Sequence, residues 1–235
     1  MMSNLFSIFD SSTSHIFELN WLSSISNFIF MPLTFWILKS RILKILDIIL
    51  LTLHFEFKTI LFLKFNYLNS IYFISLFLLI LLNNFLGLYP YIFTSSSHLI
   101  FAISFSMPLW LSLMIFSWFM NTNFMFSHMI PQSTPNLLMP FMVLIETVSN
   151  FIRPATLAIR LTANMIAGHL LVTLLSESAN TSISFISLFI INIQIILLLL
   201  EFSVSIIQSY VFSILSILYT KETNYNLNKL KIHPF

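Results

Sequence analysis

Long apolar runs constrain this chain more than any other feature. A helix needs roughly 20 mainly apolar residues to cross a hydrocarbon core about 30 Å thick. The sequence has 58% hydrophobic and only 8% charged residues, whereas soluble domains carry about 25% charged residues. So few charges cannot cover a water-facing surface, which argues against a water-soluble enzyme, a disordered chain or a nucleic-acid-binding protein. We therefore predict an all-α polytopic membrane protein.

Five apolar runs are long enough to be membrane helices. They cover residues 17–38, 67–89, 98–120, 138–175 and 183–219. Residues 39–64 instead mix basic and acidic side chains with Ile and Leu, which favours one amphipathic helix lying in the membrane interface. No repeat stands out along the chain, so residues 1–235 are predicted to form a single membrane domain.

The last two runs exceed what a bilayer needs. Residues 138–175 would extend about 57 Å as a helix at about 1.5 Å per residue. Helices of this length must tilt strongly or lie along another element within the membrane. We expect the last two runs to form a long tilted hairpin.

The positions of basic residues predict the orientation. With five crossings, every Lys and Arg outside the apolar runs falls on the side of the C-terminus. The positive-inside rule then predicts an N-out, C-in chain. The first 38 residues contain no Lys or Arg, so we expect neither a secretory signal nor an Arg-rich transit peptide.

The fourth run contains a polar stripe. An arginine at mid-membrane costs about 2.5–3.5 kcal/mol on insertion scales, so each one needs a partner or a function. Six residues project within about 40° of one line on a helix. They are Glu146, Asn150, Arg153, Arg160, Asn164 and Gly168. His169 projects to the opposite side of the same helix.

The fifth run carries a second stripe, because Gln194, Glu201 and Gln208 repeat every seven residues. In an antiparallel hairpin that turns near residues 180–185, His169 would lie level with residues 191–201. Arg160 would lie level with residues 200–210.

Two interpretations of these stripes remain open. The polar side chains could bond to one another and only fix helix packing. Alternatively, Glu146, His169 and Glu201 could pass protons, since carboxylates and imidazole accept and release them. Arg160 stays protonated, so its role would be that of a fixed positive charge. Arg153 is predicted to pair with Glu146 or Asn150, and the other histidines are predicted to be solvated.

Three motifs carry a resemblance to a known family. Residues 157–171 read LAIRLTANMIAGHLL, residues 82–90 read LNNFLGLYP, and residues 206–212 read IIQSYVF. Together they closely resemble subunit a of the mitochondrial ATP synthase, and residues 1–10 resemble its insect form. The resemblance covers nearly the whole chain.

The resemblance implies a proton path against a rotating ring of c subunits. The residues it assigns to this path are Arg160, Glu146, Asn164, His169, Glu201 and Gln208. Arg160 would face the ring and separate two half-channels. His169 and Glu201 would line the half-channel from the intermembrane space, and Glu146 would lie in the one to the matrix. Asn164 and Gln208 match polar positions of the family near the arginine.

The resemblance also implies a cellular setting and a set of partners. The chain would be a multi-pass, mitochondrially encoded protein of the inner membrane, with its N-terminus toward the intermembrane space and its C-terminus toward the matrix. Its partners would be the c ring, other stator subunits of the membrane sector, protons and the lipid bilayer, with no nucleic acid. No cofactor or metal site is expected, since the chain has no Cys and no convincing ligand set. The subunit would not be catalytic alone.

Some residues depart from the insect form. Ser11 and Ala155 replace a proline and a glycine, and residues 176–181 contain no glycine. The main alternative function is an independent ion channel or secondary transporter, which would be expected to show paired repeats or broken helices. A redox subunit would need a cofactor motif, and none is convincing here.

Overall fold

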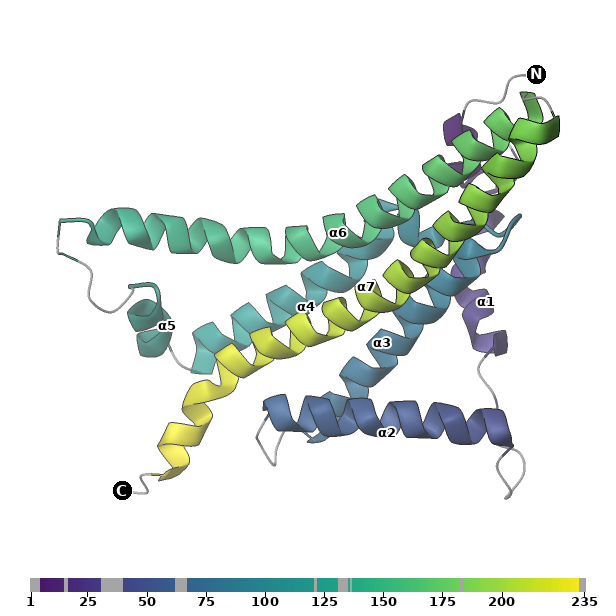
Figure 1. The fold of residues 1–235 in the computed structure, drawn as a ribbon. Coiled ribbons are helices and arrows are strands. Elements are labelled where there is room, and N and C mark those ends of the chain that lie inside the picture. The colour runs from purple at the N-terminus through teal and green to yellow at the C-terminus, as the bar shows by residue number, and fades with distance from the viewer. Residues whose placement is uncertain are drawn as a thin grey trace.

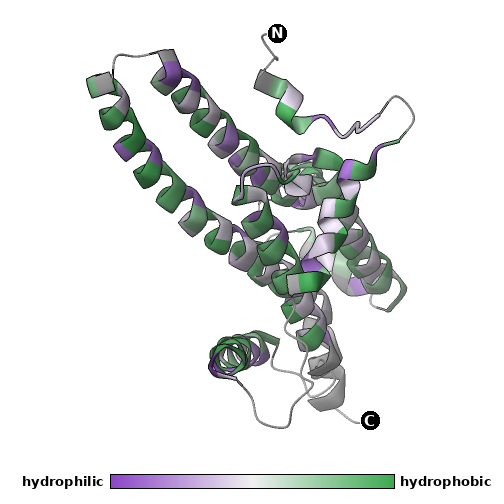
Figure 2. Cartoon of the chain, turned by 90° about the vertical axis from the view of Figure 1, so that its right-hand side faces the viewer, coloured by the Kyte–Doolittle hydropathy of each residue, from purple (hydrophilic) through white to green (hydrophobic). Residues whose placement is uncertain are grey.

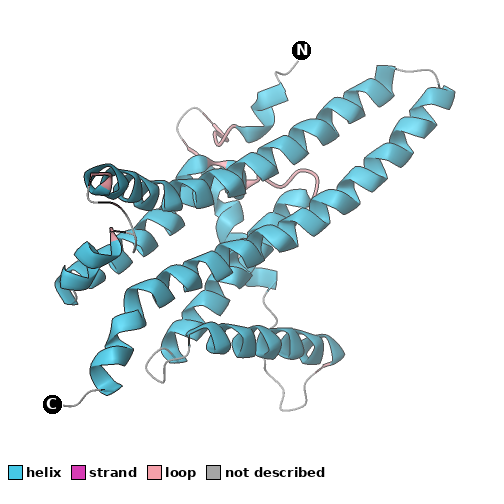
Figure 3. Cartoon of the chain, turned by 60° about the vertical axis from the view of Figure 1, so that its left-hand side comes forward, coloured by secondary structure: helices cyan, strands magenta, loops and turns pink. Residues whose placement is uncertain are grey.

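The chain is built from helices. The computed structural model describes residues 5–14, 17–30, 40–61, 67–120, 122–130, 135, 137–181 and 184–232. The α-helices are α1 (Ser23–Phe30), α2 (Arg41–Leu61), α3 (Tyr67–Leu88), α4 (Leu99–Met120), α5 (Thr122–His128), α6 (Met139–Thr181) and α7 (Ser184–Ile232). Three short 3-10 helices are η1 (Leu5–Phe9), η2 (Leu19–Leu22) and η4 (Ser95–Ser97). The described residues form no strand, which confirms the predicted fold class (Figure 3).

Four described helices are long and apolar enough to cross a membrane: α3, α4, α6 and α7. The first predicted crossing, residues 17–38, is described only as far as residue 30. Its described part consists of η2 followed by α1, which has eight residues. Its remaining residues lie outside the described part of the chain. Helix α5 lies between the predicted spans 98–120 and 138–175, where no helix was predicted.

Helices α6 and α7 form a long antiparallel hairpin, as predicted (Figures 1 and 2). Their 43 and 49 residues correspond to about 64 and 74 Å of helix. Both extend beyond the predicted ends, because residues 176–181 and 220–232 contain neither Gly nor Pro to stop a helix. Helix α6 bends along its length in Figure 1, and the buried Pro154 inside it interrupts the hydrogen-bond ladder.

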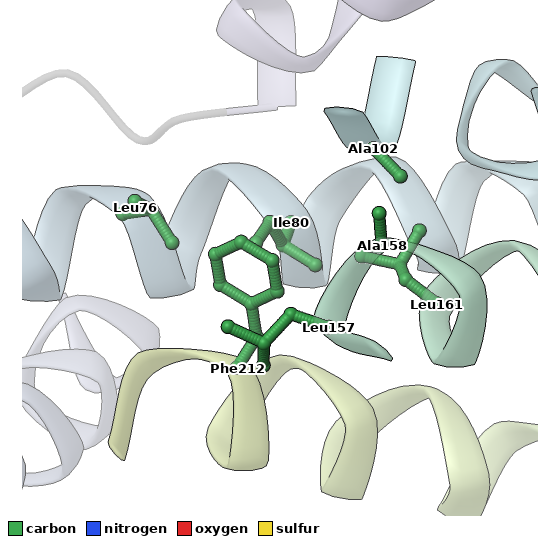
Figure 4. Close-up of a cluster of buried hydrophobic side chains, with 7 residues drawn as sticks. All are labelled: Leu76, Ile80, Ala102, Leu157, Ala158, Leu161 and Phe212. Carbon is green, nitrogen blue, oxygen red and sulfur yellow. The ribbon is translucent and has the colours of Figure 1, made fainter. Parts of the chain in front are cut away.

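A buried apolar cluster joins the hairpin to α3 and α4. Its members are Leu76, Ile80, Ala102, Leu157, Ala158, Leu161 and Phe212 (Figure 4). Helix α7 presents small polar side chains on its buried face, among them Ser205, Ser209 and Ser213. Their hydroxyls donate to backbone carbonyls three residues earlier in the same helix. These serines are therefore satisfied within α7 and act as small residues that allow close packing.

Helix α2 lies crosswise to the long spans, at the end of the molecule where α7 ends, and packs against α3 and α7 (Figure 1). Its apolar side chains Leu53, Phe57 and Leu61 form a second buried cluster with α3 and with Ile217 of α7. Its Glu56 accepts a hydrogen bond of 3.0 Å from Tyr210 of α7. The helix exposes both apolar and charged residues, as expected for an interfacial position.

Candidate functional site

The polar stripe of α6 lies along α7. Asn164 Nδ2 donates a hydrogen bond of 3.0 Å to Gln208 Oε1. Gly168 lies against the side chain of Glu201, since a Cβ atom added to the glycine would be 2.7 Å from Glu201 Oε1. These contacts place the helices in the antiparallel register predicted from the sequence. Both pairs join residues from the two predicted stripes.

A cavity of about 520 Å³ opens between the two helices beside Glu201. His169, Glu201 and Asn164 line it together with apolar side chains of both helices. His169 Nε2 and Glu201 Oε1 are buried, and neither has a hydrogen-bond partner among the described protein atoms. Buried polar atoms normally bind protein groups or ordered water, and this cavity has room for several water molecules at about 30 Å³ each. The sequence analysis expected His169 to lie level with residues 191–201, and the structure brings His169 and Glu201 to the same cavity.

Arg160 is exposed on the hairpin, unlike the buried polar atoms nearby. No hydrogen bond or ion pair joins its side chain to another described residue. It belongs to the same predicted stripe as Asn164. An arginine within an apolar membrane helix is costly unless it has a partner or a function.

A second polar group lies toward the N-terminal end of α6. Arg153 Nη1 lies 2.6 Å from Glu222 Oε2 of α7, and Arg153 Nη2 lies 3.8 Å from Glu146 Oε1. The guanidinium carbon is 5.4 Å from the centre of the Tyr219 ring. The predicted pairing with Glu146 is present but long. Glu222, which lies beyond the predicted end of the last span at residue 219, makes the closer contact.

Sequence reasoning also missed a polar cluster between the end of α3 and η4. Asn84 and Ser96 are fully buried there, and their side-chain polar atoms lack a hydrogen-bond partner among the described atoms. Ser95 donates to Asn83 Oδ1 at 3.4 Å. Asn83 and Asn84 belong to the motif at residues 82–90. No charged residue stands near them at helical spacing, so the sequence gave no sign that they are buried.

The prediction that the remaining histidines are solvated is wrong for His98. Its ring lies 5.1 Å from the rings of both Trp21 and Phe93, and its Nε2 is buried. It follows η4 directly, where the chain turns back into the apolar bundle. His54 accepts or donates a hydrogen bond with Ser70 at 3.2 Å. His15 and His233 lie outside the described residues.

Comparison with known proteins decides the family. The sequence profile of the family described as "ATP synthase A chain" matches residues 21–221. The protein named "ATP synthase subunit a" in Aedes aegypti is 55% identical over 226 residues, covering 95% of this chain and 100% of its own length. The protein of that name in Drosophila melanogaster is 53% identical over 224 residues, with the same coverage. The chain belongs to the ATP synthase subunit a family.

Membership in the subunit a family shows in which complex these helices work. The chain is a membrane-sector subunit of ATP synthase with transmembrane helices, and it takes part in ATP synthesis and proton transport. The insect relatives indicate a mitochondrial membrane. The described residues include no group of three His, Asp or Glu side chains placed to hold a metal ion.

Proposed function

We propose that this subunit a conducts protons through two offset half-channels and uses Arg160 to separate them against a rotating ring of c subunits. The observation that carries the proposal is a contrast along the hairpin. Arg160 is exposed and forms no ion pair with another described residue, whereas His169 Nε2 and Glu201 Oε1, further along, are buried beside a cavity. A fixed cation cannot relay protons, but it attracts a carboxylate on a partner and repels a proton that would pass directly.

The entrance half-channel is the cavity beside His169 and Glu201. Both side chains can take up and release a proton, and both present a buried atom that no described protein group satisfies. The hydrogen bond from Asn164 to Gln208 joins the two helices at the Arg160 end of this cavity. A proton entering here would reach a ring carboxylate next to the arginine.

The exit half-channel lies at the other end of the hairpin, near Glu146. Glu146 precedes Arg160 by 14 residues, or about 21 Å of helix, whereas His169 follows it by nine residues, or about 13.5 Å. A small separate cavity of about 50 Å³ is lined by Glu146, Asn150 and Glu222. The two cavities therefore open at different levels. A proton must ride the ring to pass from one to the other, and this coupling drives ATP synthesis in the complex.

The surface around Arg160 fits a closely packed helical partner. Thr156, Ala163 and Ala167 are exposed on the same side of α6 as Arg160. Small residues let helices approach closely within a membrane, where packing rather than the hydrophobic effect drives association. Helix α7 adds exposed apolar residues such as Leu199 and Ile207. We assign this surface to the c ring and the other exposed helices to lipid and the remaining stator subunits.

The proposed orientation places the N-terminus toward the intermembrane space and the C-terminus toward the matrix. The basic helix α2 and the end of α7 lie at one end of the molecule, opposite the N-terminus and the hairpin turn (Figure 1). The chain has no cysteine, so single cysteines report sidedness cleanly. In mitoplasts, whose outer membrane has been removed, an impermeant thiol reagent should label Asn180→Cys and spare Lys221→Cys. The reverse pattern would overturn the orientation.

Proton flux tests the function. Vesicles carrying the ATP synthase membrane sector, stripped of the soluble motor, are compared for the native subunit, Arg160→Ala and the exposed control Arg41→Ala. Arg160→Ala should lose coupled flux by a factor of about 100 or more, since a missing electrostatic stabiliser of this kind costs roughly 2.7–4 kcal/mol. Arg41→Ala should behave like the native subunit. Coupled flux through Arg160→Ala at the native level, or flux through the native subunit without any ring, would contradict the proposal, and the latter would favour an independent channel.

A further inference from the structure

Arg153 lies between two carboxylates but binds them unequally. Its Nη1 is 2.6 Å from Glu222 Oε2, which is a full charge-assisted hydrogen bond. Its Nη2 is 3.8 Å from Glu146 Oε1, which is beyond hydrogen-bond distance. The arginine and Glu146 belong to the same helix, whereas Glu222 belongs to α7. The guanidinium is therefore drawn across to the neighbouring helix and away from the acid on its own.

Helix α7 binds the guanidinium with two side chains. Tyr219 and Glu222 are three residues apart, so they project from the same face of α7. The Tyr219 ring centre lies 5.4 Å from the guanidinium carbon, within the range of a cation–π contact. An aromatic face and a carboxylate together fix both the position and the plane of an arginine head group.

This arrangement leaves the Glu146 carboxylate in a long ion pair with Arg153 but without a hydrogen bond from it. The cavity of about 50 Å³ beside it has room for a water molecule at about 30 Å³ each, and Asn150 and Glu146 both line that cavity. A carboxylate held by two parallel bonds from arginine would give both oxygens to the guanidinium. At 3.8 Å, Glu146 keeps its oxygens available for water and protons.

We propose that Glu222 is a positioning residue that holds Arg153 away from Glu146, so that the exit carboxylate stays available to protons. The inference rests on the proposed function, because it takes Glu146 as the exit group. Glu222 acts here through Arg153 and does not itself need to carry the proton.

The proposal predicts an unusual pattern among variants. In Glu222→Gln, the half-buried guanidinium loses its closer carboxylate, and Glu146 becomes the acid within its reach. Arg153 then captures Glu146, and proton flux falls about tenfold, equivalent to about 1.4 kcal/mol of barrier. Adding Arg153→Gln removes the guanidinium that binds Glu146. The double variant should therefore recover flux to within about twofold of Arg153→Gln alone, a difference of less than about 0.5 kcal/mol.

The experiment measures ring-coupled flux in membrane-sector vesicles for these three variants and for Glu222→Asp. Flux is expressed per ring-bound subunit a, which separates conduction from assembly. Glu222→Asp keeps a carboxylate and should stay near the native flux. If the double variant conducts no better than Glu222→Gln, or if Glu222→Gln matches the native subunit, the inference is overturned.

The same vesicles distinguish this failure from failure of the proposed function. Loss of flux in Arg160→Ala without rescue in the double variant would overturn only the role of Glu222. Native flux in Arg160→Ala would instead overturn the half-channel proposal on which that role rests.

Discussion

Gly168 of α6 and Glu201 of α7 face each other so closely that no larger residue fits between them without displacement. A Cβ atom on Gly168 would lie 2.7 Å from Oε1 of Glu201 and 3.0 Å from its carboxyl carbon. The missing side chain of the glycine is therefore what lets the carboxylate turn inward beside the cavity. The relationship also explains why one of only two glycines in the chain stands next to His169.

Replacing Gly168 with alanine should separate conduction from folding. The atom that must move is the end of a flexible side chain, so helix packing should survive while the Glu201 carboxylate is displaced. We expect normal assembly and a loss of flux of about tenfold, equivalent to about 1.4 kcal/mol. Flux per assembled complex measures the effect.

Gly87→Ala is the matched control. Its new Cβ would lie 3.2 Å from Thr94 Cγ2 and 3.5 Å from Met165 Cε, away from any carboxylate. Flux should stay within about twofold of the native subunit, a change of less than about 0.5 kcal/mol. Equal losses in the two glycine variants would show that Gly168 matters only for packing.

The hydrogen bond between Asn164 and Gln208 should couple the two residues energetically. Gln208 is buried, so Asn164→Ala leaves a buried amide without its partner, at about 1–3 kcal/mol. Gln208→Ala removes that amide as well. A double-mutant cycle on resistance of the membrane sector to SDS should give a coupling of about 0.6 kcal/mol, the average for such bonds in membrane helices. Additive effects would mean that the bond contributes nothing to the hairpin.

The helices and the hairpin register could be predicted because they follow from local rules. Apolar length identifies the spans, and periodicity identifies the stripes of α6 and α7. An antiparallel pair with one known turn then has its register fixed, so the levels of His169 and Glu201 follow by counting. Counting predicts that Gly168 and Glu201 lie at the same height along the hairpin. It does not predict how closely they approach each other.

The contacts of Glu222 and the burial of Asn84 could not be predicted from the sequence, for different reasons. Extension of α7 past residue 219 depends on how the polar tail packs, because composition alone suggested that the helix ended there. The predicted register places Arg153, seven residues before Arg160, level with residues 207–217, which is short of Glu222. Burial of Asn84 depends on the packing of α3 against other helices, and nothing in the spacing of the motif reveals it.

Ala163 should be essential for contact with the ring but not for folding. It lies three residues after Arg160 and is exposed on the hairpin, so a larger side chain has room to extend away from the rest of the chain. Ala163→Leu should leave insertion and helix packing unchanged. Forcing extra volume into a tightly packed helix contact costs about 1–3 kcal/mol, which corresponds to roughly a tenfold loss of ring-coupled flux. The control is Ser112→Leu on the exposed side of α4, which should conduct normally.

Both variants are compared for c-ring copurification and for flux. Because the small residues and the unpaired arginine share one side of α6, native flux in Ala163→Leu would place the ring on a different surface and remove the explanation for Arg160.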